Sequence, residues 1–396
     1  MSTFKARIKR KSTMKKGLEI CYISSFPPSR ARLSEYAYPL ISELQRLPQI
    51  GHIDIIANTI KNNTIEKIND KITVYRTWKG ENIPSLLSIL HKLSTLKPDI
   101  VHFNLHMAIF GSNRITNFIG LCLPFLCRIM GFKTIVTLHN IVEMIDIERT
   151  GFRNTTLNRA GALIATKMLT FASAVTLTVR SYLKILKRRY GCKKVFWVPH
   201  GTWKVDPVSH QRHNPKILLY FGYSGPYKDL DLLFNAFEML RKKRLDVKLI
   251  IAGASHPNYP DFLRKYVSEK PDAVDFIGYI PNHKLLSLFK KIDLVVLPYY
   301  TCTGTSGVAH LVSSYGIPII ATDLPEFREL VKEGCGILLS PHNPNELAEN
   351  IELVINNIDS ISELKERSRN FAQRRTWNKI ALSFFKVYEQ VFDSWK

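Results

Sequence analysis

The segment TGTSGVAH, residues 303–310, consists mostly of small residues and follows the apolar run IDLVVLPYY. The run predicts a buried strand, and we expect a helix to begin near Gly307 with Ser306 as its N-cap. Amides in the first turn of a helix have no intrahelical acceptor, and the helix dipole attracts negative charge there. Gly304 and Gly307 would let a diphosphate approach the main chain closely. Ser306, Gly307 and Val308 are therefore candidate phosphate ligands, and a glycine-rich turn with an ordinary cap is the alternative interpretation.

Two other loops in the second half of the chain carry groups that suit a nucleotide. FGYSGPYKDLDLLFNAF contains Gly222 near its start, and Lys228 stands just before a predicted helix. A lysine at such a place can neutralise a phosphate, although a lone lysine is more often a solvated charge. In IGYIPNHKLLSLF, the segment that begins with Tyr279 and Ile280 is a candidate for hydrogen bonds to a base.

The first half of the chain offers histidines at strand ends. His139 and Asn140 close the apolar segment KTIVTLH and are expected at the carboxyl end of a strand, where they face an inter-domain cleft. His139 either contacts a polar ligand or has a structural role. His102 and His106, in VHFNLH, are weaker candidates of the same kind. No Ser/His/Asp nucleophile pattern, metal-ligand spacing or GxGxxG motif stands out.

Parallel sheets must position these groups, because short apolar strands alternate with helical segments along the whole chain. A polar, proline-containing stretch at 198–215 reads as a linker, and an apolar amphipathic helix is expected at 378–395. The fold class is therefore α/β, with two consecutive doubly wound units. The predicted strands before the linker are 18–24, 52–58, 99–105, 133–139, 174–179 and 194–200, and those after it are 216–223, 247–253, 274–280, 293–299, 317–323 and 336–340.

The chain of 396 residues has a formal net charge of +23, which calls for an anionic partner. Basic runs occur at 5–16, 184–194 and 241–244. Each run could be a solvated face, but together they favour an anionic membrane surface as a neighbour. Phosphorylated small molecules remain candidates. Nucleic acid is disfavoured because no recognition module is present.

The six cysteines show no zinc spacing and lie partly in apolar runs, which indicates a reducing compartment. No apolar signal segment follows the basic N-terminus. The longest apolar run, FIGLCLPFLC at 118–127, is too short to span a bilayer and is flanked by Arg114, Arg128 and Lys133. It predicts either a buried helix or a helix lying in a membrane interface.

In order and spacing, nine segments resemble the retaining glycosyltransferases of the GT-B fold, the group 1 or family 4 class. The resemblance implies two Rossmann-like domains that face a cleft: an acceptor-binding domain of 1–204 with the helix 377–396, and a nucleotide-sugar-binding domain of 205–376. The segments are ISSFPPSRARLSEYAYPLISEL, KPDIVHFNLH, TIVTLHN, VFWVPHG, YFGYSGPYKDLDLLFNAFEML, LIIAG, VDFIGYIPNHKLLSLFKKIDLVVLPY, TSGVAHLVSSYGIPIIATDLPEFREL and GCGILLSPHNPNELAENI.

The same resemblance assigns roles to the candidate residues. The diphosphate would bind the amides near 306–308 with help from Lys228, and the base would lie near Tyr279 and Ile280. His139 would reach the donor sugar, and Glu326 would sit near its hydroxyls. No metal or other cofactor is implied, because helix N-termini and cations stabilise the leaving group.

Several positions depart from the family pattern. Typical members carry a glutamate at the places that Thr303 and Leu311 occupy in this sequence. The usual basic residue after FG is Tyr223, and the paired glycines of the N-terminal loop are Ala31 and Arg32. A catalytically inactive nucleotide-sugar-binding paralogue is therefore the alternative to an active enzyme.

The expected activity is metal-independent hexosyl transfer with retention, from a nucleotide-diphosphate sugar to a lipid-linked or membrane-proximal saccharide. No Asp or Glu is clearly placed as a nucleophile, which favours front-face retention. The basic runs 5–16 and 184–194 would hold the protein on the cytoplasmic face of the membrane, as a peripheral protein of glycan biosynthesis.

Overall fold

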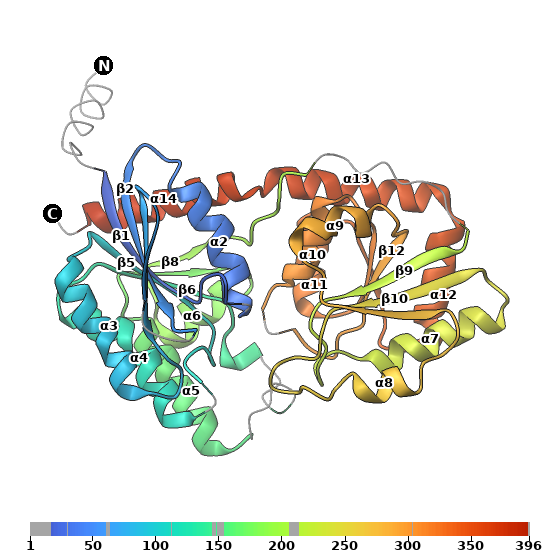
Figure 1. Ribbon diagram of the computed structural model, residues 1–396, viewed down its shortest axis with the longest axis horizontal. Helices are drawn as coiled ribbons and strands as arrows, with labels where there is room; N and C mark the ends of the chain where they lie inside the picture. Colours follow the sequence, from blue (N-terminus) through green and yellow to red (C-terminus); the bar gives the residue numbers. More distant parts are fainter. Residues whose placement is uncertain are drawn as a thin grey trace. The chain divides into compact units, whose positions relative to one another are not determined.

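A computed structural model describes residues 17–394, apart from 30, 61–63, 112, 145–147, 149–153, 206–213 and 303. The basic run 5–16 and Thr303 therefore lie outside the described residues. The chain divides into two compact units (Figure 1). Unit 1 is Met1–Glu143, Asn154–Pro199 and Trp377–Lys396, and unit 2 is Met144–Arg153 and His200–Thr376.

Unit 1 is built on an eight-stranded sheet that is parallel except for the pairing of β3 with β4. The order is β3 (Thr64–Asn69), β4 (Ile72–Trp78), β2 (Ile50–Asn58), β1 (Leu18–Ile23), β5 (Ile100–Leu105), β6 (Thr134–Leu138), β7 (Ala174–Leu177) and β8 (Val195–Trp197). The helices are α2 (Arg32–Leu44), α3 (Ile83–Leu96), α4 (Arg114–Ile129), α5 (Thr156–Leu169), α6 (Tyr182–Tyr190) and α14 (Trp377–Asp393), with the short η2 (Val142–Met144).

Buried apolar side chains fix this sheet, as expected for strands covered on both faces. Every residue of β5, β6 and β7 is buried. The last helix, α14, packs on α2, where the rings of Tyr36 and Trp377 meet edge to face with 5.1 Å between their centroids. The Tyr388 hydroxyl also lies 2.7 Å from Nδ1 of His102 on β5. The C-terminal segment is thus part of the core of unit 1.

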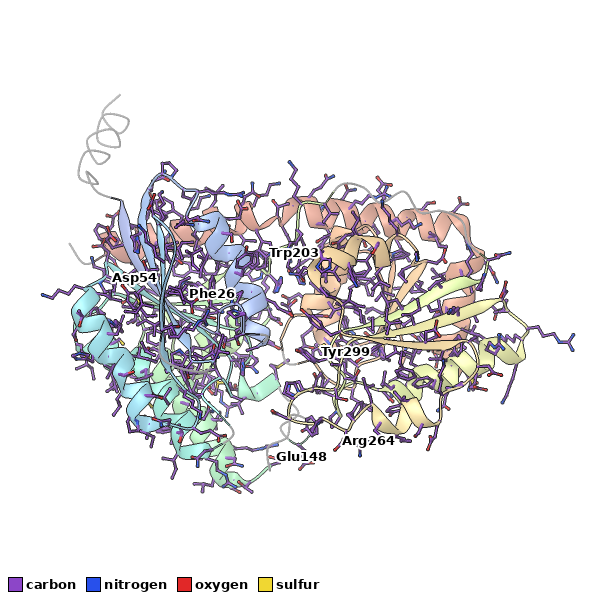
Figure 2. The ribbon with its side chains drawn as sticks, viewed as in Figure 1. Phe26, Asp54, Glu148, Trp203, Arg264 and Tyr299 are labelled. Carbon is purple, nitrogen blue, oxygen red and sulfur yellow. The ribbon has the colours of Figure 1, made fainter. Side chains whose placement is uncertain are left out.

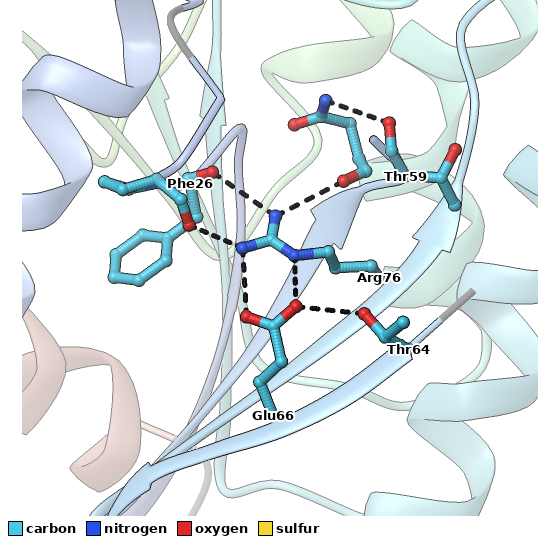
Figure 3. Close-up of polar contacts among 7 residues, drawn as sticks. Phe26, Thr59, Thr64, Glu66 and Arg76 are labelled. Carbon is cyan, nitrogen blue, oxygen red and sulfur yellow. Dashed lines mark hydrogen bonds and ion pairs between the residues drawn. The ribbon is translucent and has the colours of Figure 1, made fainter. Parts of the chain in front are cut away.

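A buried arginine ties the loop after β1 to the sheet (Figure 3). Arg76, on β4, is 2% exposed and pairs with both carboxylate oxygens of Glu66 on β3, at 2.7 and 3.2 Å. Its guanidinium also donates to the carbonyls of Phe26 and Pro27 in that loop and of Asn58 on β2. Of the five bonds that this side chain donates, the two to Phe26 and Pro27 hold the loop against the sheet.

Unit 2 contains a six-stranded sheet in which every pairing is parallel. Its order is β11 (Val274–Gly278), β10 (Val247–Ala252), β9 (Lys216–Phe221), β12 (Leu294–Leu297), β13 (Ile319–Thr322) and β14 (Ile337–Ser340). The helices are α7 (Leu230–Lys242), α8 (Arg264–Ser268), α9 (Asn282–Phe289), α10 (Gly307–Ser314), α11 (Pro325–Lys332), α12 (Pro344–Asn356) and α13 (Ile358–Arg374).

Helices cover both faces of this sheet. One core cluster joins the sheet to residues of α9, α10 and α11, and a second joins it to residues of α7 and α12. The prediction of two separate doubly wound units is confirmed by the two sheets. The strand order of unit 2 reverses between β9 and β12, which is where an open parallel sheet binds its ligands.

Candidate functional site

The loops after β9 and β12 leave the sheet of unit 2 side by side, because these two strands are paired. The β9 loop carries Gly222 and Lys228, and the β12 loop leads to Ser306. Both loops lie at the point where the strand order reverses. Two groups of candidates that are some eighty positions apart in sequence therefore meet at one edge of the sheet.

Helix α10 begins as the sequence predicts, with Ser306 as its N-cap. The Ser306 hydroxyl accepts a hydrogen bond of 3.3 Å from the amide of Ala309. Among the described residues, no acceptor is recorded for the amides of Gly307 and Val308. The cap therefore satisfies the third amide of the first turn, that of Ala309, and leaves the amides of Gly307 and Val308 able to bind an anion.

Two histidines lie beside this helix start. Nδ1 of His310 donates to the carbonyl of Ser306 at 2.8 Å, which fixes the cap from inside the helix. Burial lowers the pKa of His310 well below its usual value, so the ring is neutral at physiological pH. The ring of His200 lies 4.6 Å from that of His310, and its Nε2 would be 3.7 Å from a Cβ added at Gly307. His200 thus lies beside Gly307.

Gly222 and Val308 are neighbours. A Cβ at Gly222 would lie 3.2 Å from Cγ2 of Val308, and Gly222 has a φ of 112°, where side chains are strained. Its amide donates to the carbonyl of Ala252 at 2.9 Å. Gly253 packs still closer, since a Cβ there would lie 2.0 Å from the Gly222 carbonyl oxygen. Glycine at 222 and 253 is needed by the backbone itself, whatever ligand binds.

Lys228 is a buried cation at this edge of the sheet. It is 8% exposed, and its Nζ lies 2.8 Å from the ring centroid of Tyr299, which is labelled in Figure 2. The main chain of the two residues forms a bridge, and the Lys228 amide donates to Gly225 at 2.8 Å. An ammonium over an aromatic face is stabilised by the ring quadrupole. The structure therefore holds a positive charge in place at the β9 loop.

The remaining donor-side candidates are placed as follows. Glu326 lies in the first turn of α11 and is 6% exposed, so the helix dipole acts on a buried carboxyl group. Tyr279 follows β11 and is 44% exposed, whereas Ile280 packs against the core cluster. Leu311, at one of the positions that the family gives to glutamate, packs against the same cluster.

In unit 1, His139 belongs to a polar cluster at the ends of three strands. Its Nε2 lies 2.7 Å from Oδ1 of Asn104, whose amide nitrogen donates to the Ser24 hydroxyl at 3.0 Å. The ring of Tyr36 meets the His139 ring edge to face at 4.6 Å. Because the amide group of Asn104 is oriented by Ser24, its oxygen accepts from Nε2–H and selects that tautomer of His139. Asn140 instead accepts from the Met107 amide at 2.9 Å, a bond that shapes the loop after β5.

His102 has a structural role. It is fully buried and is bonded through Nδ1 to Tyr388 and through Nε2 to Thr137, each at 2.7 Å. Burial lowers its pKa to about 3. The hypothesis that His102 contacts a ligand is therefore wrong, because both ring nitrogens are used inside the core. Nδ1 of His106 accepts from the Ala108 amide at 3.1 Å.

Four groups beside the candidates were not found from the sequence: Ser24, Asn104, His200 and Tyr299. The segment VPHG contains His200 before a glycine, but no feature of the segment predicted that His200 would lie beside α10. Among the residues that the structure describes, no group of three or more His, Cys, Asp and Glu side chains could hold a metal ion.

Residues 202–374 match the family model described as Glycosyl transferases group 1. This segment of the chain is therefore similar to the glycosyl transferases group 1 domain. It contains α10, Gly222, Lys228, Tyr279, Ile280 and Glu326. The donor-side candidates therefore all belong to the matched domain.

Curated relatives agree with this assignment. An uncharacterized glycosyltransferase of Methanocaldococcus jannaschii is 28% identical over 44% of this chain and 48% of its own length. A second one from that organism is 24% identical over 86% of this chain and 90% of its own length. A phosphatidyl-myo-inositol mannosyltransferase of Mycobacterium tuberculosis is 26% identical over 45% of this chain and 48% of its own length. The matched region thus spans about half the length of the first and third of these relatives.

Solved structures show the fold of the whole chain. Sucrose-phosphate synthase from Thermosynechococcus elongatus superposes with a TM-score of 0.76 at 18% identity, covering 95% of this chain and all of the other. HepE of Anabaena in complex with UDP-glucose gives 0.69 at 14% identity, covering 94% and 100%. The GT-B fold expected from the sequence is confirmed.

Proposed function

We propose that the protein transfers a hexose from a nucleotide-diphosphate sugar to a saccharide acceptor, lipid-linked or close to a membrane, with retention at the anomeric carbon. The observation that carries the proposal is that Gly222 lies beside the first turn of α10 at the switch point of the sheet. Lys228 is buried in the same β9 loop, and the whole segment matches the glycosyl transferases group 1 model. A uridine nucleotide is the first donor to test, since HepE of Anabaena was solved with UDP-glucose.

The chemistry follows from where negative charge develops. As the bond from C1 of the sugar to the diphosphate breaks, the sugar gains oxocarbenium character and the diphosphate takes the electron pair. The amides of Gly307 and Val308 and the Lys228 ammonium would stabilise that charge without a metal ion. They are fixed before the reaction by the cap and by Tyr299, so little reorganisation is needed.

We assign the remaining candidates by resemblance to the family. Tyr279 and Ile280 would hold the base, and Glu326 and His139 would contact the donor sugar as catalytic residues. No carboxylate is assigned as a nucleophile, so the acceptor would attack from the face that the diphosphate leaves.

A panel of nucleotide sugars tests the proposal. The melting temperature is measured with UDP-, GDP- and dTDP-sugars, and the best binder is then used in transfer assays with lipid-linked and free saccharides. We expect one nucleotide to raise the melting temperature, transfer to persist in EDTA, and the product to keep the anomeric configuration of the donor. No shift with any nucleotide sugar would contradict the proposal.

A catalytically inactive nucleotide-sugar-binding protein is the second candidate, because Leu311 takes the place of a usual glutamate and packs in the core. The same panel separates the two: a binding protein would show the melting shift but neither transfer nor hydrolysis of a labelled donor.

We further propose a peripheral place on the cytoplasmic face of the membrane. Lys184, Lys187 and Arg188 are exposed on α6, and none of the helices in the described residues could cross a bilayer. The relative named for phosphatidyl-myo-inositol also supports a lipid acceptor. Changing these three residues to Gln should weaken binding to anionic vesicles at low salt, and unchanged binding would count against it.

A further inference from the structure

Helices α4 and α5 of unit 1 run side by side and share an outward face (Figure 1). Each helix turns one side to the protein, where Leu121, Leu123 and Cys127 of α4 and Ala165 and Leu169 of α5 are buried. On an ordinary surface helix the opposite side is polar. On these two helices it is largely apolar.

Large apolar side chains repeat along the outward face. Ile115 and Ile129 are two thirds exposed, and Leu157 and Ile164 are 72% and 52% exposed. The members at each helix follow a helical period and therefore form a stripe. Including the residues just after each helix, the exposed set is Ile115, Ile129, Met130, Leu157, Ile164 and Phe171.

The two stripes join into one surface. The rings of Phe125 on α4 and Phe171 after α5 lie 5.5 Å apart, so the apolar side chains of the two helices are continuous there. Nζ of Lys167 lies 5.6 Å from the Phe171 ring centroid and donates to the Tyr190 carbonyl. A monomeric soluble protein seldom exposes so many large apolar groups together unless something covers them.

The two segments that carry α4 and α5 contain basic residues but no acidic ones, and the acidic residues between these segments are Glu143, Asp146 and Glu148. The chain contains 33 acidic residues, yet none falls in 100–142 or in 149–205, the two segments that include α4 and α5. Arg114 and Arg128 lie at the two ends of α4. Arg159 and Lys167 are exposed on α5. A cover with negative charge and an apolar layer beneath it matches this pattern.

We propose that the outward face of α4 and α5 docks on an anionic lipid bilayer. The apolar stripes would enter the boundary between headgroups and acyl chains, and the arginines and lysine would lie among the headgroup phosphates. This inference deepens the membrane-surface part of the proposed function and adds a docking face that the basic runs 5–16 and 184–194 do not include. In this proposal the run 118–127 packs on the core, and the exposed residues that flank it, Ile115 and Ile129, contact the membrane.

Vesicle sedimentation tests the apolar part. The variant Ile115→Ser, Leu157→Ser, Ile164→Ser is compared with a matched variant of unit 2 that carries Val267→Ser, Leu286→Ser and Leu353→Ser, all at exposed positions. With vesicles of phosphatidylglycerol and phosphatidylcholine, we expect the unit 1 variant to bind about tenfold or more weakly than wild type. The unit 2 variant should bind as wild type does. Equal binding by both variants would overturn the proposal.

A second variant tests the charge. Arg114→Gln with Arg159→Gln should weaken binding to the anionic vesicles in low salt and leave the residual binding to pure phosphatidylcholine unchanged. A loss of similar size on both vesicle types would refute the assignment of these arginines to headgroup phosphates.

Two controls separate this inference from its alternatives. Sedimentation velocity reports self-association: a wild-type dimer that the unit 1 variant abolishes, with no vesicle binding, would make this face a homodimer interface and overturn the proposal. Melting shifts with nucleotide sugars are measured on the same variants. If those shifts persist while wild type fails to bind vesicles, the docking inference is wrong and the proposed donor site stands. If vesicle binding responds as expected but no nucleotide sugar binds, the proposed function is wrong and the docking face stands.

Discussion

Gly307→Val is the sharpest test of the donor site, because the structure predicts a loss of binding without a loss of fold. A Cβ at residue 307 would meet only Nε2 of His200, at 3.7 Å, which is an ordinary contact. Gly307 starts a helix, and valine is a better helix residue than glycine by some tenths of a kcal/mol. We therefore expect the melting temperature of the variant to match or slightly exceed that of wild type.

Donor affinity should respond very differently. The branched side chain would cover the amides of Gly307 and Val308, which the proposed function gives to the diphosphate. One charge-assisted hydrogen bond contributes about 1.5 to 3 kcal/mol, so its loss lowers affinity roughly tenfold to a hundredfold. Calorimetric titration with the preferred nucleotide sugar measures this loss.

Gly161→Val is the matched control, because Gly161 is also a helical glycine and a Cβ there would meet nothing within 4 Å. It should bind the donor as wild type does. If Gly307→Val and Gly161→Val bind the donor equally well, α10 is only a capped helix and the donor site lies elsewhere.

Three further outcomes follow from buried charges. Lys228→Met should lower donor affinity about tenfold in calorimetric titration, because it removes the buried cation of the β9 loop, while the exposed control Lys290→Met should leave donor affinity unchanged. Folding lowers the pKa of His102 to about 3, so below about pH 6.5 the unfolded chain binds a proton on this ring that the folded chain does not bind. At pH 4.5 this difference costs about 3 kcal/mol of stability. In urea unfolding, His102→Gln should therefore lose less stability than wild type between pH 8 and pH 4.5. Arg76→Met should lower the free energy of unfolding by about 3 kcal/mol or more, because two loop carbonyls lose their donor and Glu66 loses its partner. Glu66→Gln should cost less, because its amide oxygen can still accept from the guanidinium and the loop carbonyls keep their donor; equal losses would contradict this account of the network.

The sequence predicted strands inside the sheets and also the edge strands β8, β11 and β14, and it missed the neighbouring strands β3 and β4 of unit 1. Central parallel strands are continuous apolar runs, such as LEICYI in β1. β3 reads TIEKIN and is exposed along most of its length, so it has no apolar pattern to detect. β4 does alternate, but one of its inward positions is Arg76, whose charge is compensated by Glu66 and by loop carbonyls far away in sequence.

The candidate site shows the same limit. Small residues and a serine before an apolar helix were enough to predict the N-cap at Ser306, since capping is local. The partners of the other candidates come from distant segments: Tyr299 lies under the ammonium of Lys228, and Asn104 accepts from His139. Spacing along the chain carries no information on such contacts, because they arise only when strands pair.

The groups at the carboxyl ends of the strands differ in charge between the two units, and this difference bears on what each unit can bind. In unit 1 the polar groups at the strand ends satisfy one another, since Asn104 bonds both Ser24 and His139 and therefore leaves no fixed excess of charge in that cluster. In unit 2 the strand ends present a buried ammonium and the start of a helix dipole, and both favour an anion. In the proposed function the diphosphate of the donor is that anion, so substitutions at Lys228 or Gly307 should act first on donor affinity. Sugar transfer should also respond to His139 of unit 1 and Glu326 of unit 2.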